Sequence, residues 1–202
     1  MTSIYAIKPA FQNLLRPLCK WLAAHGVTAN QVTLAAFGLS LLTALVLALN
    51  STQMRIFLLL PLVMFVRMAL NAIDGMLARE HGMKSNLGAI LNELTDVVSD
   101  AALYLPFALL PVVCPSLLVF VVIAAILTEM TGVIAVQIGA SRRYDGPMGK
   151  SDRAFMFGAV ALAMGLGVQS GNWLNWVFGL VLALTVLTVF NRARQALKEV
   201  AK

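Results

Sequence analysis

The chain has 202 residues, 60% of them hydrophobic and 12% charged, and its mean hydropathy is +0.85. Soluble domains carry roughly 45–50% apolar and about 25% charged residues, so this composition excludes an ordinary soluble protein and indicates an integral membrane protein. The net charge of +6 requires no nucleic-acid partner, because the basic residues are concentrated in loops on one side of the predicted membrane spans.

Residues 1–25 have the pattern of an amphipathic helix. We expect this helix to lie in the headgroup region of the membrane with its cations outward and its apolar face down. The alternative is a helix packed on the loops of the protein. The apolar face comprises Ile4, Ile7, Phe11, Leu14, Leu18 and Leu22, and the opposite stripe comprises Lys8, Gln12, Arg16 and Lys20.

Six apolar runs follow, most of them near the length of about 20 residues that spans a bilayer, although the fifth is short. They are Gln31–Leu49, Ile56–Ile73, Leu87–Leu110, Ser116–Ala140, Ala154–Val168 and Trp173–Phe190. The sequence therefore predicts a single all-α integral membrane domain with six transmembrane helices. Residues 1–25 form the interfacial amphipathic helix, residues 27–190 the six-helix bundle, and residues 191–202 a tail.

The loops alternate sharply in charge along the chain. Both termini and the loops Asp74–Leu87 and Ser141–Arg153 carry Lys and Arg, whereas the opposite side carries Arg55 alone. Because Lys and Arg in short loops stay in the cytoplasm, both termini and these two loops are predicted to be cytoplasmic. The expected location is a bacterial inner membrane.

Polar side chains recur at helical spacing in the second and third runs. Arg67, Asn71, Asp74 and Ala78 share one helix face, and Gly88, Asn92, Asp96 and Asp100 share another. A short loop joins the two helices, so we expect antiparallel neighbours whose oxygen ligands hold a hard divalent cation, Mg²⁺ or Mn²⁺. Small side chains at Gly75 and Ala78 let a diphosphate approach, and Arg79 can pair with a phosphate oxygen.

This pattern resembles the signature of the CDP-alcohol phosphotransferases, six-helix membrane enzymes that make phospholipids. The matching residues are Asp74-Gly75-x-x-Ala78-Arg79, then Gly88 and Asp96 at the family's spacing. The segment Thr28–Thr33 also resembles the family's Thr-Pro-Asn-x-x-Thr entry to its first helix, with Ala29 in place of Pro. The chain departs from the signature at two of its four aspartates, where it has Asn71 and Asn92.

The resemblance implies an enzyme that transfers a phosphatidyl group from a CDP-linked lipid, such as CDP-diacylglycerol, to a small polar alcohol and releases CMP. Asp96 would accept the proton of the acceptor hydroxyl. One or two metal ions at Asn71, Asp74, Asn92 and Asp96 would bind the diphosphate. Gly75, Ala78 and Arg79 would contact the nucleotide, with Asn30 and Thr33 bordering the same pocket. A homodimer is also expected from the resemblance.

The two asparagines leave three interpretations of the site open. Glu93 or Asp100 replaces the missing carboxylates as a metal ligand. Alternatively, a single metal ion suffices. In the third, the chain is a catalytically impaired family member that binds nucleotide or lipid in a regulatory role.

Two further groups of charged residues have alternative interpretations. Arg67 and Glu129 lie deep in spans and are expected to form a buried ion pair, unless Arg67 reaches the site instead. Positive-inside topology alone would explain the basic residues Arg142, Arg143, Lys150 and Arg153. In the family, however, a basic pocket in this region receives the acceptor's phosphate, which would favour glycerol 3-phosphate or an inositol phosphate over serine.

Overall fold

The computed structural model describes residues 4–201, and it describes side chains from Pro9 onward. The predicted placement of the Ile4, Ile7 and Lys8 side chains lies outside the described residues. Across the described range the fold is all-α, as predicted. The α-helices are α1 (Ile4–Ala24), α2 (Ala29–Leu49), α3 (Leu59–Glu80), α4 (Asn86–Tyr104), α5 (Pro115–Gln137), α6 (Lys150–Gly165) and α7 (Trp173–Val200); short 3₁₀ helices η1 (Met54–Leu58) and η2 (Leu105–Leu109) precede α3 and follow α4.

Each predicted apolar run overlaps one of the helices α2 to α7, and the second and third runs also include the 3₁₀ helices η1 and η2. Four stretches are long and apolar enough to cross a membrane, namely Ala29–Leu49, Met54–Glu80, Pro115–Gln137 and Trp173–Val200. Helix α6 has only 16 residues. Helix α4 carries Glu93, Asp96 and Asp100, which reduce its apolar character. By length and composition, the described residues therefore contain four candidate spans, compared with the six that the sequence predicts.

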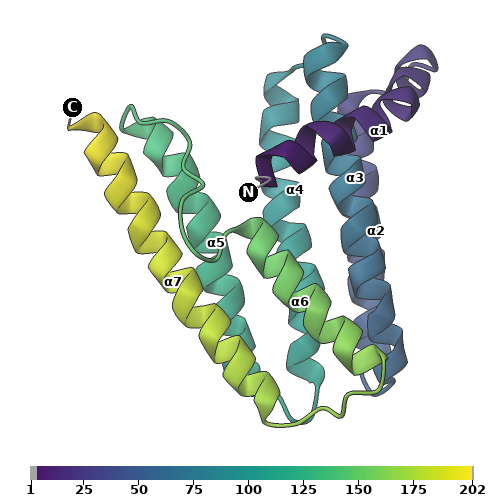
Figure 1. The fold of residues 1–202 in the computed structure, drawn as a ribbon, viewed down its shortest axis with the longest axis vertical. Coiled ribbons are helices and arrows are strands. Elements are labelled where there is room, and N and C mark those ends of the chain that lie inside the picture. Colours follow the sequence, from purple (N-terminus) through teal and green to yellow (C-terminus); the bar gives the residue numbers. More distant parts are fainter. Residues whose placement is uncertain (1–3, 202) are drawn as a thin grey trace. The chain divides into compact units, whose positions relative to one another are not determined.

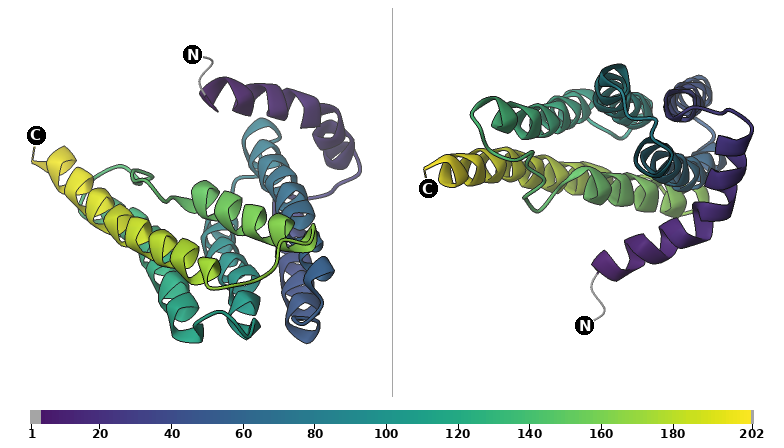
Figure 2. Two further views of the ribbon diagram at one scale, coloured as in Figure 1. Left: turned by 60° about the horizontal axis from the view of Figure 1, so that its bottom comes forward. Right: turned by 90° about the horizontal axis from the view of Figure 1, so that it is seen from above.

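The chain forms two compact units. Unit 1 comprises the chain up to Leu42 together with Leu62–Ser99, and unit 2 comprises Thr43–Pro61 together with the chain from Asp100 onward. In unit 1, α1 lies across the ends of the helices at which α3 meets α4 (Figure 1, Figure 2). The buried core of unit 1 is formed by side chains of α1, α2 and α3, namely Cys19, Ala29, Val32, Ile73, Met76 and Leu77.

Only part of the surface of helix α1 packs against the other helices of unit 1. Arg16 forms an ion pair with Glu80 at the end of α3, at 3.0 Å, and Cys19 is fully buried. Leu14 is 74% exposed, and Leu18 and Trp21 are also exposed. Apolar side chains thus remain exposed along α1.

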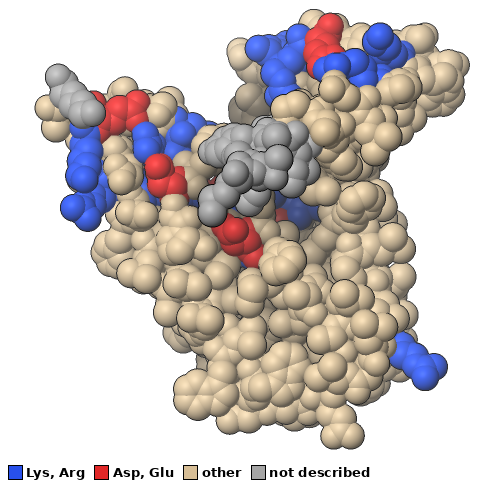
Figure 3. Space-filling model, viewed as in Figure 1, with Lys and Arg blue, Asp and Glu red and all other residues tan. Residues whose placement is uncertain are grey.

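Aromatic side chains form the core of unit 2. Tyr104 stacks on Phe157 with ring centroids 3.9 Å apart, and Phe107 contacts Phe57, Phe157 and Phe178 edge-on. Helix α5 packs along α7. Charged side chains gather over the α3–α4 connection in unit 1 and over the ends of α5 and α7 in unit 2, while uncharged residues cover the long sides of the helices (Figure 3).

Candidate nucleotide and metal site

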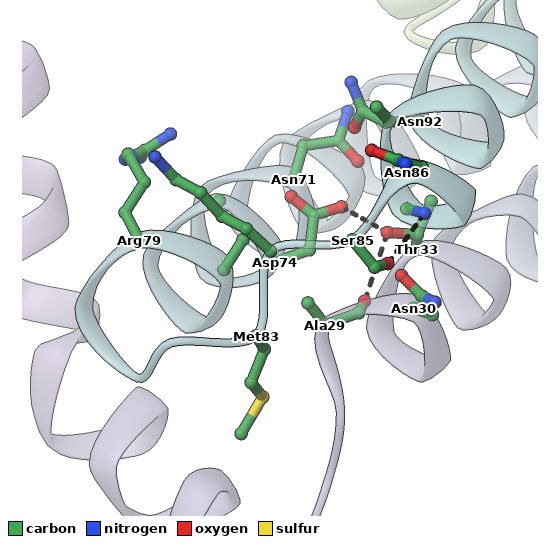
Figure 4. A pocket seen from close by; sticks show the side chains of 15 residues that line it. Ala29, Asn30, Thr33, Asn71, Asp74, Arg79, Met83, Ser85, Asn86 and Asn92 are labelled. Carbon is green, nitrogen blue, oxygen red and sulfur yellow. Dashed lines mark hydrogen bonds between the residues drawn. The ribbon is translucent and has the colours of Figure 1, made fainter.

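A cavity of about 610 Å³ opens in unit 1 where the first turns of α2 and α4 meet the last turns of α3 (Figure 4). Its volume lies in the range of about 300–1,000 Å³ that is usual for small-molecule sites. Nine residues singled out in the sequence line it: Asn30, Thr33, Asn71, Asp74, Gly75, Ala78, Arg79, Gly88 and Asn92. The lining also includes Ala29, which the sequence analysis named only as part of the Thr28–Thr33 motif. Sequence reasoning missed five further lining residues, namely Met83, Lys84, Ser85, Asn86 and Ala89.

Capping interactions fix the starts of the two helices that open into the cavity. Thr28 and Gln31 form a capping box, in which each side chain accepts a hydrogen bond from the other's backbone N–H, at 3.3 and 2.9 Å. Ser85 Oγ accepts from the Gly88 N–H at 3.0 Å and starts α4 in the same way. Because two helix N-termini meet at this cavity, their partial positive charges favour an anion there.

Two glycines keep the cavity open. A Cβ on Gly88 would lie 2.7 Å from Asn30 Oδ1 and 3.0 Å from Ser85 Oγ, so a larger residue there would displace these side chains from the cavity wall. A Cβ on Gly75 would lie 3.1 Å from the Arg79 guanidinium nitrogens. Gly75 therefore leaves room for Arg79 beside the exposed turn of α3.

Asp74 is the one acid among the described residues that line the cavity. It is buried, and the Thr33 hydroxyl lies 2.8 Å from its Oδ2 and 3.1 Å from the Ala29 carbonyl oxygen. The hydroxyl has a single proton, and the carboxylate is the stronger acceptor. Thr33 thus orients Asp74 toward the cavity, as Figure 4 shows.

Asp96 lies behind this lining, where it accepts hydrogen bonds from α3. Arg67 Nη2 lies 3.1 Å from Asp96 Oδ1 and 3.1 Å from its backbone oxygen, and Asn71 Nδ2 donates to the same Oδ1 at 3.1 Å. Since Asn71 also lines the cavity, it connects Asp96 to it. These contacts confirm that α3 and α4 are antiparallel neighbours. Glu93 and Asp100, the two predicted substitute ligands, do not line the cavity.

The side chains at the cavity include oxygen donors of the kind that a hard divalent cation prefers. In the part of the chain that the structure describes, no three His, Cys, Asp or Glu side chains group into a metal site. The oxygen donors that line the cavity are the Asp74 carboxylate, the amide oxygens of Asn30, Asn71, Asn86 and Asn92, and the hydroxyls of Thr33 and Ser85. Mg²⁺ is often held by one or two carboxylates together with substrate phosphates, so this donor set is sufficient for a single ion shared with a diphosphate.

The four basic residues predicted to bind an acceptor lie in unit 2 and have different surroundings. Arg153 is fully buried and its Nη2 lies 3.0 Å from Glu129 Oε1. Arg142 Nη2 lies 3.5 Å from Glu129 Oε2. Arg143 instead pairs with Asp145 and Glu199, while Lys150 is half-buried in the first turn of α6.

A fifth basic residue, Arg192 of α7, completes the group around Glu129. Its Nη1 lies 3.4 Å from Glu129 Oε1 and donates to the Thr128 carbonyl. Sequence reasoning missed Arg192 because it is one of several cations at the C-terminal end, where membrane topology already explains them. Arg142, Arg153 and Arg192 are called the arginine cluster below. The expected Arg67–Glu129 pair is corrected, since Glu129 pairs with this cluster and Arg67 pairs with Asp96.

Comparison with known proteins extends these observations. The family model described as CDP-alcohol phosphatidyltransferase matches residues 26–190. The chain is 52% identical over 195 residues to the inner membrane protein YnbA of Escherichia coli, covering 96% of each chain. It is also 33% identical over 103 residues to the archaetidylinositol phosphate synthase of Pyrococcus horikoshii. That match covers 51% of this chain and 52% of the synthase.

Solved structures share the fold. The phosphatidylinositol phosphate synthase PgsA1 of Mycobacterium tuberculosis with CDP-DAG bound matches with a TM-score of 0.73 at 20% identity, covering 89% of this chain and 92% of that one. The same enzyme in complex with manganese and citrate matches with a TM-score of 0.74 at 20% identity, covering 90% and 88%. The apolar helices and the similarity to an inner membrane protein identify a bacterial integral membrane protein. Because the family model spans most of the sequence, the chain belongs to the CDP-alcohol phosphatidyltransferase family.

Proposed function

We propose that this protein transfers a phosphatidyl-type group from a CDP-linked lipid, such as CDP-diacylglycerol, to a small polar alcohol and releases CMP. The observation that carries the proposal is the charge of the unit 1 cavity. Two helix N-termini, Arg79 and Lys84 face a single described acid, Asp74. This balance suits a nucleoside diphosphate, because the site supplies positive charge on several sides.

Each part of the cavity then has a role in the transfer. Arg79 and Lys84 bind phosphate oxygens, and Gly75, Ala78 and Gly88 let the diphosphate approach the backbone. Asn30 and Thr33 border the nucleotide. Asp74, with the amide oxygens of Asn71 and Asn92, would hold Mg²⁺ or Mn²⁺, which neutralises phosphate charge when bound. The similar enzyme PgsA1, whose structure is known with manganese, supports a divalent cation.

Asp96 is the proposed general base. In the transfer, the acceptor oxygen forms a bond to the lipid-side phosphorus of the donor, and its proton passes to the Asp96 carboxylate. The bond from that phosphorus to the bridging oxygen breaks, and CMP departs with the electron pair. Arg67 and Asn71 hold one oxygen of Asp96 by hydrogen bonds, so the carboxylate keeps a fixed orientation during proton transfer.

The acceptor is proposed to carry a phosphate or another anionic group. The arginine cluster supplies three guanidinium groups around one carboxylate, and Arg153 Nε is buried without a hydrogen-bond partner among the described residues. Arg143 and Lys150 extend the basic character at the start of α6. Two similar proteins are named as synthases of inositol phosphate lipids, which supports a phosphorylated acceptor.

The membrane arrangement proposed for this function has six spans, with α4 and α6 crossing alongside the four long apolar helices. Both termini and the cavity face the cytoplasm, α1 lies at the interface, and two copies form a homodimer. The concentration of basic residues in the loops on one side supports the sidedness. Single-cysteine labelling at positions 55 and 84 from either side of the membrane tests it.

A second candidate function is nucleotide or lipid binding without transfer. Asn71 and Asn92 favour this alternative, because an amide brings no charge to a metal. Purified protein supplied with CDP-diacylglycerol labelled in the nucleotide, Mn²⁺ and a panel of alcohols separates the two. We expect CMP release with a phosphorylated alcohol such as glycerol 3-phosphate or an inositol phosphate. CDP binding without CMP release from any acceptor would favour the binding function, and the absence of both would exclude each.

A further inference from the structure

Two side chains of α3, one arginine and one asparagine, contact the Asp96 carboxylate, and both contact the same carboxylate oxygen. Arg67 Nη2 and Asn71 Nδ2 each lie 3.1 Å from Asp96 Oδ1. Arg67 is buried, with 6% of its surface exposed. A buried guanidinium at this depth of an apolar helix needs a counter-charge, and Asp96 supplies one.

The amide at position 71 is suited to this arrangement, whereas a carboxylate would not be. An aspartate side chain there would place a second acceptor 3.1 Å from Asp96 Oδ1, and two carboxylates that close repel unless a proton or a cation lies between them. The Asn71 amide donates a hydrogen atom instead, while its oxygen lies on the Asp74 side of the cavity (Figure 4). The Asn71 amide nitrogen therefore donates a hydrogen bond to Asp96, while its amide oxygen faces the cavity.

We propose that Arg67 takes the electrostatic place of a second metal ion beside Asp96, so that the site binds one divalent cation per chain, at Asp74. The proposal rests on the function proposed above, and it makes Arg67 a positioning residue that acts through Asp96. The charges support it. Asp74 is the one acid among the described residues that line the cavity, and Arg67 forms an ion pair with Asp96 behind that lining.

Counting bound manganese tests the proposal independently of turnover. The purified protein, in detergent with saturating CDP, is titrated with Mn²⁺, and the free ion is measured by its electron paramagnetic resonance signal. We expect one Mn²⁺ per chain for the wild-type protein and for Arg67→Lys, which keeps the charge. For Arg67→Gln we expect the number to rise toward two, because Asp96 then requires a new counter-charge. Arg55→Gln, which removes a cation from the other unit, is the matched control and should bind one.

Two manganese ions per wild-type chain would overturn the proposal while leaving the transferase function intact. A count of one in Arg67→Gln, with CDP bound at wild-type affinity, would overturn it as well. If Arg67→Gln does not fold, the counts for the wild-type and Arg67→Lys proteins still decide, because each must be one. The absence of any CDP-dependent Mn²⁺ binding in the wild-type protein would instead contradict the proposed function itself.

Discussion

Both units of this protein bury acidic and basic side chains, but the balance between the two charges differs. In unit 1, Asp96 has one arginine and one amide as partners, and Asp74 has a hydroxyl. In unit 2, Glu129 has the three guanidinium groups of the arginine cluster. The first region therefore presents acid and amide oxygens at its cavity, while the second carries an excess of buried positive charge.

The largest effect should come from Asp96→Asn, which removes the proposed base but not the hydrogen-bond acceptor for Arg67. We expect CMP release to fall by about 10²–10⁴-fold, the usual contribution of a general base. CDP affinity should change little, because Asp96 does not line the cavity. The measurement is initial-rate CMP release beside CDP binding on the same preparation. Unchanged turnover would remove Asp96 from this role.

Asp152→Asn is the control for this substitution. It makes the same chemical change at a carboxylate that accepts a hydrogen bond from the Gly149 N–H, 2.9 Å away, at the start of α6. An asparagine oxygen can accept the same bond, so turnover should stay near the wild-type value.

The second effect tests how strongly the arginine cluster depends on its single acid. Glu129→Gln leaves three guanidinium groups close together without a negative charge between them. Breaking a buried ion pair in this way costs about 3–5 kcal/mol, so the unfolding temperature in detergent should fall sharply. Glu80→Gln is the matched control, because the Arg16–Glu80 pair is 39% exposed on both sides and such pairs contribute only about 0–1 kcal/mol. Equal losses in the two variants would show that burial does not matter here.

The sequence predicted the helices well and the cavity in part. Apolar runs bounded by polar loops identify α2 to α7, and helical spacing places Asn71 and Asp74 on the face that meets α4. Lys84, Ser85 and Asn86 were missed because a connection between helices has no periodicity that reveals which way its side chains point. The partners of Arg67 were also beyond the sequence, since its position on α3 is compatible with Asp96 and with Glu129.

A third, smaller effect concerns the close approach that makes the unit 1 cavity. Gly88→Ala adds a methyl group that would lie 2.7 Å from Asn30 Oδ1, so Asn30 or α4 must move. A displaced Asn30 would change the wall of the proposed nucleotide site, and we expect CDP to bind about 5- to 10-fold more weakly, a change of about 1–1.4 kcal/mol. Gly38→Ala is the control, because a Cβ there meets nothing within 4 Å. Isothermal titration with CDP compares them, and equal affinities would mean that nucleotide does not bind beside Gly88.

The smallest expected effect on stability concerns Arg143, which is less deeply buried than Arg153 and Arg192 of the arginine cluster. Hydrogen bonds from Arg143, at 2.7 and 2.9 Å, hold the pKa of Asp145 below the usual value of about 4. Because the folded-state pKa is lowered, this pair stabilises the protein at neutral pH. The stabilisation is lost as the pH falls below about 4 and through the lowered pKa. Asp145 is partly exposed, so the contribution should be no more than about 1 kcal/mol.

Thermal unfolding of the wild-type protein and of Asp145→Asn between pH 7 and pH 3 measures this contribution. The difference between the two should be largest at neutral pH and should shrink toward zero at the acid end. Other carboxylates also titrate in this range, but they do so in both proteins and cancel in the comparison. A difference that stays constant down to pH 3 would mean that Asp145 acts through its shape or its neutral hydrogen bonds. Glu129 would then be the acid that balances the arginines of unit 2, and the Arg143–Asp145 ion pair would not stabilise the protein through its charges.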